Sequence, residues 1–199
     1  MTSDINICNM ALGNIGAAPI VSFSDESQTA RICASYYGHV RKYLLSAYPW
    51  SFNRRHVRLV PLPKGEEYED EPVFIYAYPT EALYINCVYS KEFPGRKLRY
   101  DIRVCGEGKR RLFADVPGPL FADCRADVED VSVWPAVFCE TVSWALSMRI
   151  ALALAKDNGV ASNCNGMYLQ ALGRALCECA NEPDMPMDGG SSWLEAREI

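Results

Sequence analysis

The sequence predicts a mixed α+β fold that is mainly helical, in which both ends of the chain form a helical bundle around an inserted antiparallel β module. Three observations predict this fold. Apolar residues recur at helical spacing within 25–47 and again within 134–180. Residues 57–131 are instead rich in the aromatic, β-branched and alternating patterns of strands. A chain of 199 residues has room for one domain with a modest insertion.

The N-terminal part of the bundle, residues 1–56, is predicted to begin with a short helix at 5–12. Asp4 is suited to cap its first turn, because a short polar side chain can accept hydrogen bonds from free amide groups there. Gly13 and Gly16 follow and are typical of a helix end.

A longer helix is predicted over 25–47. Asp25 and Gln28 have the spacing of a capping box at its start, and Pro49 disfavours helical geometry at the residue before it. Its wet flanks are expected to hold Arg31, Arg41 and Lys42. Its buried face is expected to hold Cys33, Tyr37, Val40, Leu44 and Ala47.

The inserted module at 57–131 begins with a charged, proline-bounded loop at 61–72. Strands are expected at 73–79 and 82–90, and a hairpin is expected where 97–105 and 110–116 flank a GEGK turn. The first hairpin strand alternates, which predicts one buried face made of Leu98, Tyr100, Ile102 and Val104. The module is expected to hold about four to six strands, a usual number for one sheet.

Helix returns over 132–182. Pro135 suits the first turn of a long helix that is apolar on most of its surface, and Asn158-Gly159 is expected to end it. A last helix is predicted at 162–180, before Pro183. The bundle is therefore expected to bury the long helix at its centre.

Composition and charge favour a soluble protein made and folded in a cytoplasm. The net charge of −5 and pI near 5.1 argue against binding nucleic acid with the whole surface. The N-terminus has no basic segment followed by an apolar run, so no secretion signal is predicted. Glu140 and Arg149 interrupt the most apolar stretch, which indicates a buried helix and not a membrane span.

The nine cysteines are odd in number and scattered, and only Cys177 and Cys179 lie close together. Two thiols at that spacing point to different faces of a helix, so they make a poor metal chelate. We expect buried, reduced cysteines and no cofactor or metal. A thiol-dependent or metal-bound protein, or a cation site in the acidic run at 66–71, stays open as a less favoured alternative.

No catalytic constellation is present, and the chain is not expected to be an enzyme. The glycines of CGEGKRR lack the phosphate-loop spacing and fit a hairpin turn better. Neither G-x-S-x-G nor H-E-x-x-H occurs, and His39 and His56 are the only histidines.

A basic cluster, Arg54, Arg55 and Arg58, surrounds His56 and directly follows the aromatic residues Trp50 and Phe52. One hypothesis is an interface at which the arginines contact phosphate and the rings form a ligand platform. The alternative is that the arginines lie on the solvated face of a strand and the rings cover the edge of the core.

The C-terminal segment, residues 183–199, combines prolines and a glycine pair with two large apolar residues, Trp193 and Leu194. Such a segment cannot build a core of its own, yet tryptophan is a frequent interface residue. Two interpretations remain equal on this evidence: an extended docking arm for a partner, or a segment that folds back on its own bundle.

Several stretches taken together resemble the tail tubular protein A type of head-to-tail adaptor in short-tailed bacteriophages. The similar stretches are ALGNIGAAPIVSFSDESQTARICASYYGHVRKYLLSAYPWSF at 11–52, YAYP at 76–79, WPAVFCETVSWALSMRIALALA at 134–155 and SSWLEAR at 191–197. The sequence departs from the family pattern after Tyr78, where Pro79, Thr80 and Glu81 follow.

The resemblance implies a structural virion protein, assembled in the host bacterial cytoplasm. Such adaptors form a ring, typically of twelve subunits, that joins the portal protein to the tail nozzle protein and extends the channel for viral DNA. Trp193 and Leu194 would then dock on the portal or on a neighbouring subunit, with Glu195 and Arg197 fixing the register. The competing hypothesis is a small nucleic-acid-binding module that uses the cluster from Arg54 to Arg58.

Overall fold

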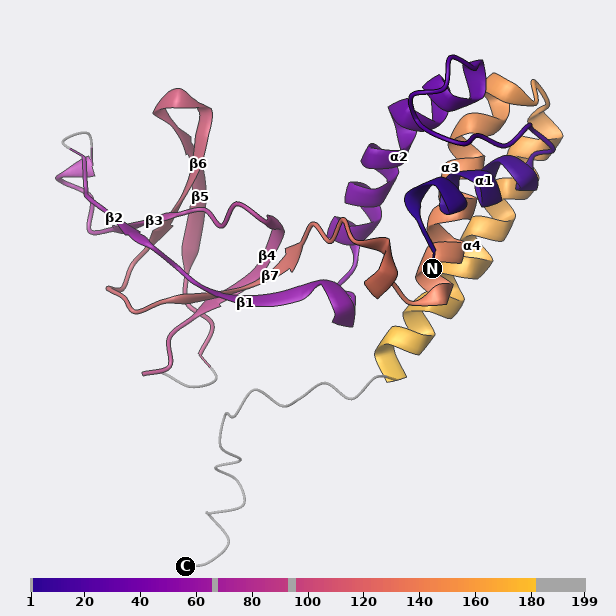
Figure 1. Cartoon of the computed structure of the whole chain (residues 1–199). Coiled ribbons are helices and arrows are strands. Elements are labelled where there is room, and N and C mark those ends of the chain that lie inside the picture. The colour runs from indigo at the N-terminus through magenta and orange to yellow at the C-terminus, as the bar shows by residue number, and fades with distance from the viewer. Residues whose placement is uncertain (1, 66–67, 93–95, 182–199) are drawn as a thin grey trace, which may run out of the picture. The chain divides into compact units, whose positions relative to one another are not determined.

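The computed structural model describes residues 2–65, 68–92 and 96–181, which form a mixed α+β fold (Figure 1). The described chain divides into a helical unit, made of residues 2–53 and 127–181, and a β unit, made of residues 54–126. The helices are α1 (Asp4–Asn14), α2 (Gln28–Ala47), α3 (Ala136–Leu154) and α4 (Asn158–Asn181). The strands are β1 (Arg54–Arg58), β2 (Pro61–Leu62), β3 (Phe74–Ala77), β4 (Ala82–Tyr89), β5 (Tyr100–Cys105), β6 (Lys109–Ala114) and β7 (Phe121–Ala126).

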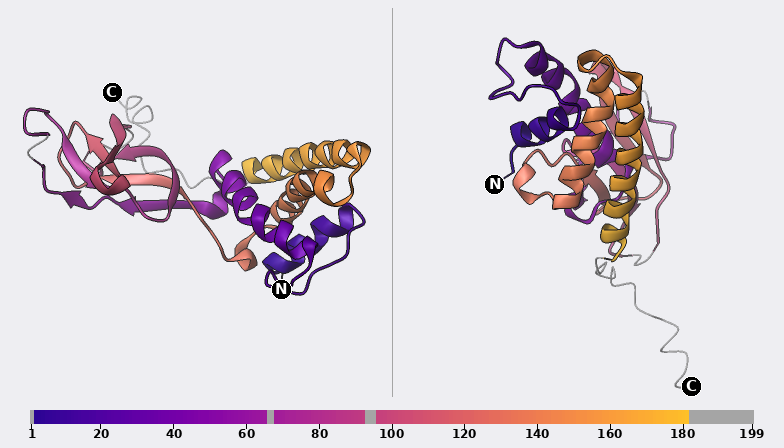
Figure 2. Two further views of the ribbon diagram at one scale, coloured as in Figure 1. Left: turned by 90° about the horizontal axis from the view of Figure 1, so that it is seen from above. Right: turned by 90° about the vertical axis from the view of Figure 1, so that its right-hand side faces the viewer.

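The helical unit is organised around α3, which contacts α1, α2 and α4. It runs side by side with α4 along most of its length (Figure 2). By length and composition α3 is apolar enough to cross a membrane, but its buried residues pack against the other helices. Ser147 on α3 donates a hydrogen bond to the Ala11 carbonyl of α1 at 3.1 Å. The expected central apolar helix is therefore present in the helical unit.

Both N-terminal helices begin at different caps from those predicted. Ser3, not Asp4, caps α1, and its hydroxyl accepts from the Asn6 amide. Ser27 caps α2 by accepting from the Ala30 amide. The Asp25 carboxylate instead accepts from the amides of Val21 and Ser22, because it closes a turn before the helix.

The predicted end of the long helix was also wrong. Asn158 and Gly159 begin α4 instead of ending α3, because the Asp157 carboxylate accepts from the Gly159 amide at 2.7 Å and caps the new helix. The chain turns at Lys156, whose φ of 54° is left-handed.

The predicted buried face of α2 is confirmed at Cys33, Tyr37, Val40 and Leu44, whereas Ala47 is exposed. Arg41 does not lie on a wet flank. Its side chain is only 12% exposed, because the guanidinium pairs with Asp127 at 3.0 Å and with Glu129 at 2.6 Å. The two acids, which lie outside the helix, thus hold the Arg41 side chain in a mostly buried position.

The β unit contains two antiparallel sheets and not the single sheet expected. One has the order β1-β7-β4 and the other β2-β3-β6-β5. The predicted hairpin is confirmed as β5 and β6, joined by a turn at Gly106–Gly108. The short strand β2 forms inside the expected loop, because Pro61 and Leu62 pair with Tyr76 and Ile75 of β3.

The main core of the β unit takes residues from both sheets: Leu59, Tyr76, Ala82, Ile85, Val88, Leu98, Leu112, Ala114, Leu120, Ala122 and Cys124. Leu98 and Tyr100 pack in or against this cluster as predicted. Ile102 and Val104 are 39% and 72% exposed, which contradicts the predicted buried face. They lie further along the hairpin, outside the cluster.

Candidate nucleic-acid interface

The three-stranded sheet β1-β7-β4 has one core face and one outer face. Val57 on β1 packs against the main core, and Ala122 and Cys124 on β7 are part of it. Because side chains alternate along a strand, Arg54, His56 and Arg58 lie on the opposite face. The basic residues of β1 therefore belong to the outer face.

The register shows which residues of the other two strands share this face. Arg54, His56 and Arg58 stand opposite Arg125, Asp123 and Phe121 of β7. On the other side of β7, the same Arg125, Asp123 and Phe121 stand opposite Tyr84, Cys87 and Tyr89 of β4, in that order. We call the outer face the set Arg54, His56, Arg58, Tyr84, Tyr89, Lys91, Phe121, Asp123 and Arg125.

The one carboxylate of this set is buried and paired. Asp123 is 3% exposed, and its oxygens accept from Arg54 Nε at 3.1 Å and from Arg54 Nη2 at 3.0 Å. The two-nitrogen contact holds the guanidinium flat against the acid. The acid therefore neutralises Arg54.

A row of rings crosses the sheet from β1 to β4. His56 Nδ1 lies 3.1 Å from Tyr89 Oη, and the Tyr89 ring stacks on Phe121 with centroids 5.7 Å apart. Lys91 Nζ lies 5.0 Å from the centroid of the Phe121 ring. Burial raises the pKa of Tyr89, so its hydroxyl stays neutral at physiological pH.

A second cation lies over a ring at the other end of β7. The Arg125 guanidinium is 4.5 Å from the Tyr84 ring centroid, and its Nε donates to Asn86 Oδ1 at 2.9 Å. Half of the Tyr84 side chain is exposed, so this cation and ring form part of the surface. The amide holds the guanidinium over the ring.

The outer face is positively charged although the chain is acidic. Four of its residues are Lys or Arg, one is Asp, and the Asp is paired with Arg54. Arg58 is exposed and has no acidic partner in the described part of the chain. Fixed cations beside aromatic rings can contact phosphate groups without reading bases. The face is chemically suited to a polyanion.

The structure places the sequence-predicted interface residues on two units. Arg54, Arg55 and Arg58 all lie on β1; Arg55 is exposed and its Nη1 donates to the Arg54 carbonyl at 3.0 Å. Trp50 and Phe52 belong to the helical unit, so the predicted cluster divides at the start of β1.

Trp50 is a core residue and not a ligand platform. It is 2% exposed, and its indole Nε1 donates to the Leu44 carbonyl at 2.8 Å. Phe52 packs edge-on against Phe138 of α3, with ring centroids 4.9 Å apart. Of the two hypotheses for Trp50, the core one therefore holds, because helix α3 supplies the apolar surface that this ring covers.

The docking residues Trp193, Leu194, Glu195 and Arg197 lie outside the described residues. Seven cysteines are buried, Cys179 is half-buried and Cys177 is exposed. Within residues 2–65, 68–92 and 96–181, no group of three His, Cys, Asp or Glu side chains could hold a metal ion.

The parts of the outer face that come from β4 and β7 were not predicted from the sequence. The signal was present in FADCRA, where Phe121, Asp123 and Arg125 alternate with small apolar residues. In such a short segment the alternation alone does not show which side chains face solvent. This becomes clear only when the pairing with β1 is known, because the period does not identify the partner strand.

No family model matches the chain, and no curated protein matches it significantly.

Proposed function

We propose that this chain is a structural head-to-tail adaptor of a short-tailed bacteriophage. In this role a ring of subunits, typically twelve in the adaptors it resembles, joins the portal to the tail nozzle and extends the channel for the viral DNA. The protein would act in the virion, after assembly in the bacterial cytoplasm, and would not be an enzyme.

One observation supports this proposal most. The two long stretches that resemble the adaptors, residues 11–52 and 134–155, supply all of α2 and α3 and part of α1. These helices contact one another through α3, so the two long stretches lie together in one unit, although α4, which also packs on α3, is not part of them.

We propose further that the helical unit acts as a rigid bundle and that one of its faces meets a different face of the next subunit. A closed ring of identical chains needs such a heterologous interface. Exposed apolar side chains on the described helices are available for it, among them Leu152 of α3 and Leu169 of α4, which are 56% and 57% exposed.

Residues 183–199 form the docking arm of this proposal, with Trp193 and Leu194 entering a pocket on the portal or on a neighbouring subunit. If Trp193 is such an anchor, Trp193→Ala is expected to cost about 2 kcal/mol or more of binding free energy per subunit. Glu195 and Arg197 would fix the register of the arm through polar contacts.

The test is co-sedimentation with the portal protein from the same genome. The full chain is expected to bind stoichiometrically, and a chain that ends at Asp188 is expected to lose binding. Binding by both chains would keep the adaptor function and remove the arm from it. A well-folded full chain that does not bind would contradict the adaptor proposal.

The outer face supports a second candidate, a nucleic-acid-binding module. Arg58, which has no acidic partner among the described residues, and the cations over Phe121 and Tyr84 favour contact with phosphates. This candidate predicts affinity for short duplex DNA that falls steeply with salt, whereas an adaptor through which DNA slides is expected to bind it little. Titration of labelled duplex DNA at two salt concentrations separates the two.

A further inference from the structure

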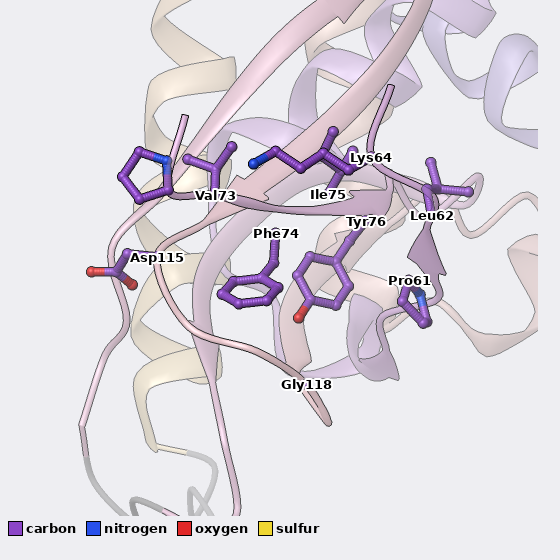
Figure 3. A pocket seen from close by; sticks show the side chains of 10 residues that line it. Pro61, Leu62, Lys64, Val73, Phe74, Ile75, Tyr76, Asp115 and Gly118 are labelled. Carbon is purple, nitrogen blue, oxygen red and sulfur yellow. The ribbon is translucent and has the colours of Figure 1, made fainter. Parts of the chain in front are cut away.

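Two hollows of similar volume lie beside the four-stranded sheet β2-β3-β6-β5, and they differ in charge. The first, of about 510 Å³, is lined mainly by apolar residues such as Phe74 and Tyr76, and its charged residues Lys64 and Asp115 are of opposite sign (Figure 3). The second, of about 500 Å³, is lined by charged residues of positive sign. The second hollow therefore indicates the chemistry of a ligand, an anion.

We call the second hollow the basic hollow. It lies where β3 ends, because Ala77 is the last residue of β3 and stands opposite Arg111, whereas β6 begins two residues earlier. After β3 the chain turns, and the Ala82 amide donates to the Pro79 carbonyl at 3.1 Å. The lining of the basic hollow includes Lys109, Arg110 and Arg111 of β6, together with Ala77, Tyr78 and Thr80 from the end of β3 and the turn.

Arg110 is held in the basic hollow by an aromatic ring. The centre of its guanidinium lies 4.1 Å from the centroid of the Tyr78 ring, a favourable contact for a cation. Burial raises the pKa of Tyr78, although Arg110 acts in the opposite direction, so the hydroxyl stays neutral at physiological pH. Among the lining residues of the basic hollow there is no Asp or Glu. Its lining therefore carries positive charge alone at that pH.

Arg111 is half-buried and has no anionic partner in the described part of the chain. The other half-buried arginines of the described residues all contact a carboxylate, an amide or a ring: Arg41, Arg54, Arg103, Arg125 and Arg149. Partial burial of a cation costs free energy unless a partner compensates for the lost water. An anion in the basic hollow would supply that partner.

The strand register gives a second reason. Arg111 stands directly opposite Arg103 of β5, and like charges at such positions destabilise an antiparallel pair. Carboxylate oxygens of Asp101 and Glu71 lie 2.8 and 2.9 Å from nitrogens of Arg103, so this arginine is neutralised. The charge of Arg111 remains. An anion bound to Arg111 would neutralise the second member of the pair.

The surrounding segment is also strongly basic. Residues 96–111 contain seven Lys or Arg residues and two acids, Asp101 and Glu107, which gives a net charge of +5 in a chain whose net charge is −5. Such a local excess of positive charge raises the concentration of anions near it. The field of the segment thus favours the same kind of ligand as the lining does.

Volume and charge favour a compact ligand with several negative charges. The volume lies within the range of about 300–1,000 Å³ typical of ligand pockets. A phosphate monoester carries a charge of about −1.5 to −2 at pH 7 and accepts two parallel hydrogen bonds from a guanidinium. A nucleic-acid strand spreads its charges at one per about 3.4 Å of helix axis, whereas an oligophosphate places several in one small volume.

We propose that the basic hollow binds an oligophosphate, either inorganic or the phosphate chain of a nucleotide. Arg110 and Arg111 contact its oxygens, the Thr80 hydroxyl is a further donor, and Lys109 adds positive charge. The site lies on a different sheet from the outer face. It goes beyond the adaptor function and does not rest on it.

The first test is chemical protection of the full chain by tripolyphosphate. Phenylglyoxal modifies guanidinium groups, and mass spectrometry of the digested protein gives the rate at each arginine. Saturating tripolyphosphate is expected to slow modification of Arg110 and Arg111 by about fivefold or more, because their donors are occupied. Arg99, an exposed arginine of the same unit, is the control and should keep its rate. Unchanged rates at Arg110 and Arg111, or equal slowing of Arg99, would overturn the proposal.

Affinity measured by isothermal titration calorimetry gives an independent test. Arg111→Gln is expected to weaken tripolyphosphate binding by about tenfold or more, because charge-assisted hydrogen bonds are lost. Arg110→Gln changes an exposed side chain and is expected to weaken it as well. Arg58→Gln on the outer face should have no effect. Weaker binding in Arg58→Gln but not in Arg111→Gln would place the anion on the outer face and overturn the proposal.

Two further ligands identify the source of the phosphate. ATP that binds more tightly than tripolyphosphate would show that the base or ribose also contacts the protein, whereas equal affinity would show that the phosphate chain alone is recognised. Both results support the proposal. Protection of Arg111 by a single-stranded oligonucleotide but not by tripolyphosphate would overturn it in favour of a nucleic-acid site. None of these measurements needs the portal, so their failure is distinct from a failure of the adaptor function.

Discussion

Arg54 of β1 and Asp123 of β7, 69 positions apart in the sequence, join their strands through contacts of 3.0–3.2 Å between guanidinium and carboxylate. The acid is almost fully buried, whereas the arginine side chain is 32% exposed. The pair therefore links β1 to β7, and part of the Arg54 side chain stays in contact with solvent.

Arg54→Met is expected to destabilise the chain by about 2–3 kcal/mol, because it leaves a buried carboxylate without its cation. The value is below that of a fully buried pair, since solvent reaches the Arg54 side chain. Urea unfolding followed by circular dichroism measures the loss. Arg58→Met on the same strand is the matched control and should change stability by no more than about 0.5 kcal/mol.

Whatever affinity the chain has for short duplex DNA is expected to depend on the outer face. Arg58→Ala combined with Lys91→Ala should lower the slope of log affinity against log salt by about two units, because two phosphate contacts are lost. Arg31→Ala, an exposed arginine on α2, is the control and should leave the slope unchanged. Equal effects of both changes would show that the contact is not localised on this face.

Tyr37→Phe is expected to stabilise the chain by about 1 kcal/mol at neutral pH. The Tyr37 hydroxyl is buried and has no hydrogen-bond partner among the described residues. Its removal therefore breaks no hydrogen bond and relieves the free-energy cost of keeping an unpaired polar group away from water. The ring, which lies 5.7 Å from Phe23, is kept. Thermal unfolding of the two proteins gives the difference, and a clear loss of stability would indicate that the hydroxyl is bonded to water.

The same residue should contribute to alkaline unfolding. Burial raises the pKa of Tyr37 above the value of about 10 for an unfolded chain. The folded state therefore favours the neutral phenol. Above a pH of about 10 the hydroxyl ionises in the unfolded chain first, which lowers the free energy of unfolding as the pH rises further. Stability measured between pH 9 and 12 should fall less steeply in Tyr37→Phe than in the parent chain.

The cysteines should differ sharply in reactivity. Burial raises the pKa of Cys124 to about 11 and also raises that of Cys139, so few thiolates form there at pH 8. Iodoacetamide is expected to modify Cys177 first and Cys179 more slowly, and the seven buried thiols only after unfolding. Rapid modification of Cys124 in the folded chain would contradict the burial described for β7.

Helical spacing was enough to predict the elements of the helical unit, since α2 and α3 each show a long apolar pattern. The caps were harder to predict, because Ser27, Asp25 and Asp157 all carry side chains that suit a helix start, and only the local turn decides which one is used. For the same reason the predicted start of the last helix, at residue 162, was wrong, and α4 begins at Asn158.

The candidate site needed the three-dimensional pairing of strands. Arg54 and Arg58 were visible as a basic cluster, but Asp123, which neutralises Arg54, lies far away in sequence and is not marked by any local pattern. Trp50 was assigned two roles, and only contact with Phe138 of α3 decides between them. Trp50 and Arg54 are close in sequence, but long-range contacts give them different roles: Trp50 packs against Phe138, and Arg54 pairs with Asp123.

The β unit begins and ends in neighbouring strands, since Arg54 of β1 stands opposite Arg125 of β7. The backbone therefore leaves the helical unit and returns to it at points about 5 Å apart, a gap that a tight turn can bridge. Because so little chain is needed to close that gap, we expect that the whole segment can be exchanged as a cassette. Recombination between genomes could replace it with a different module in one step, and the interior of the four helices would not have to be redesigned.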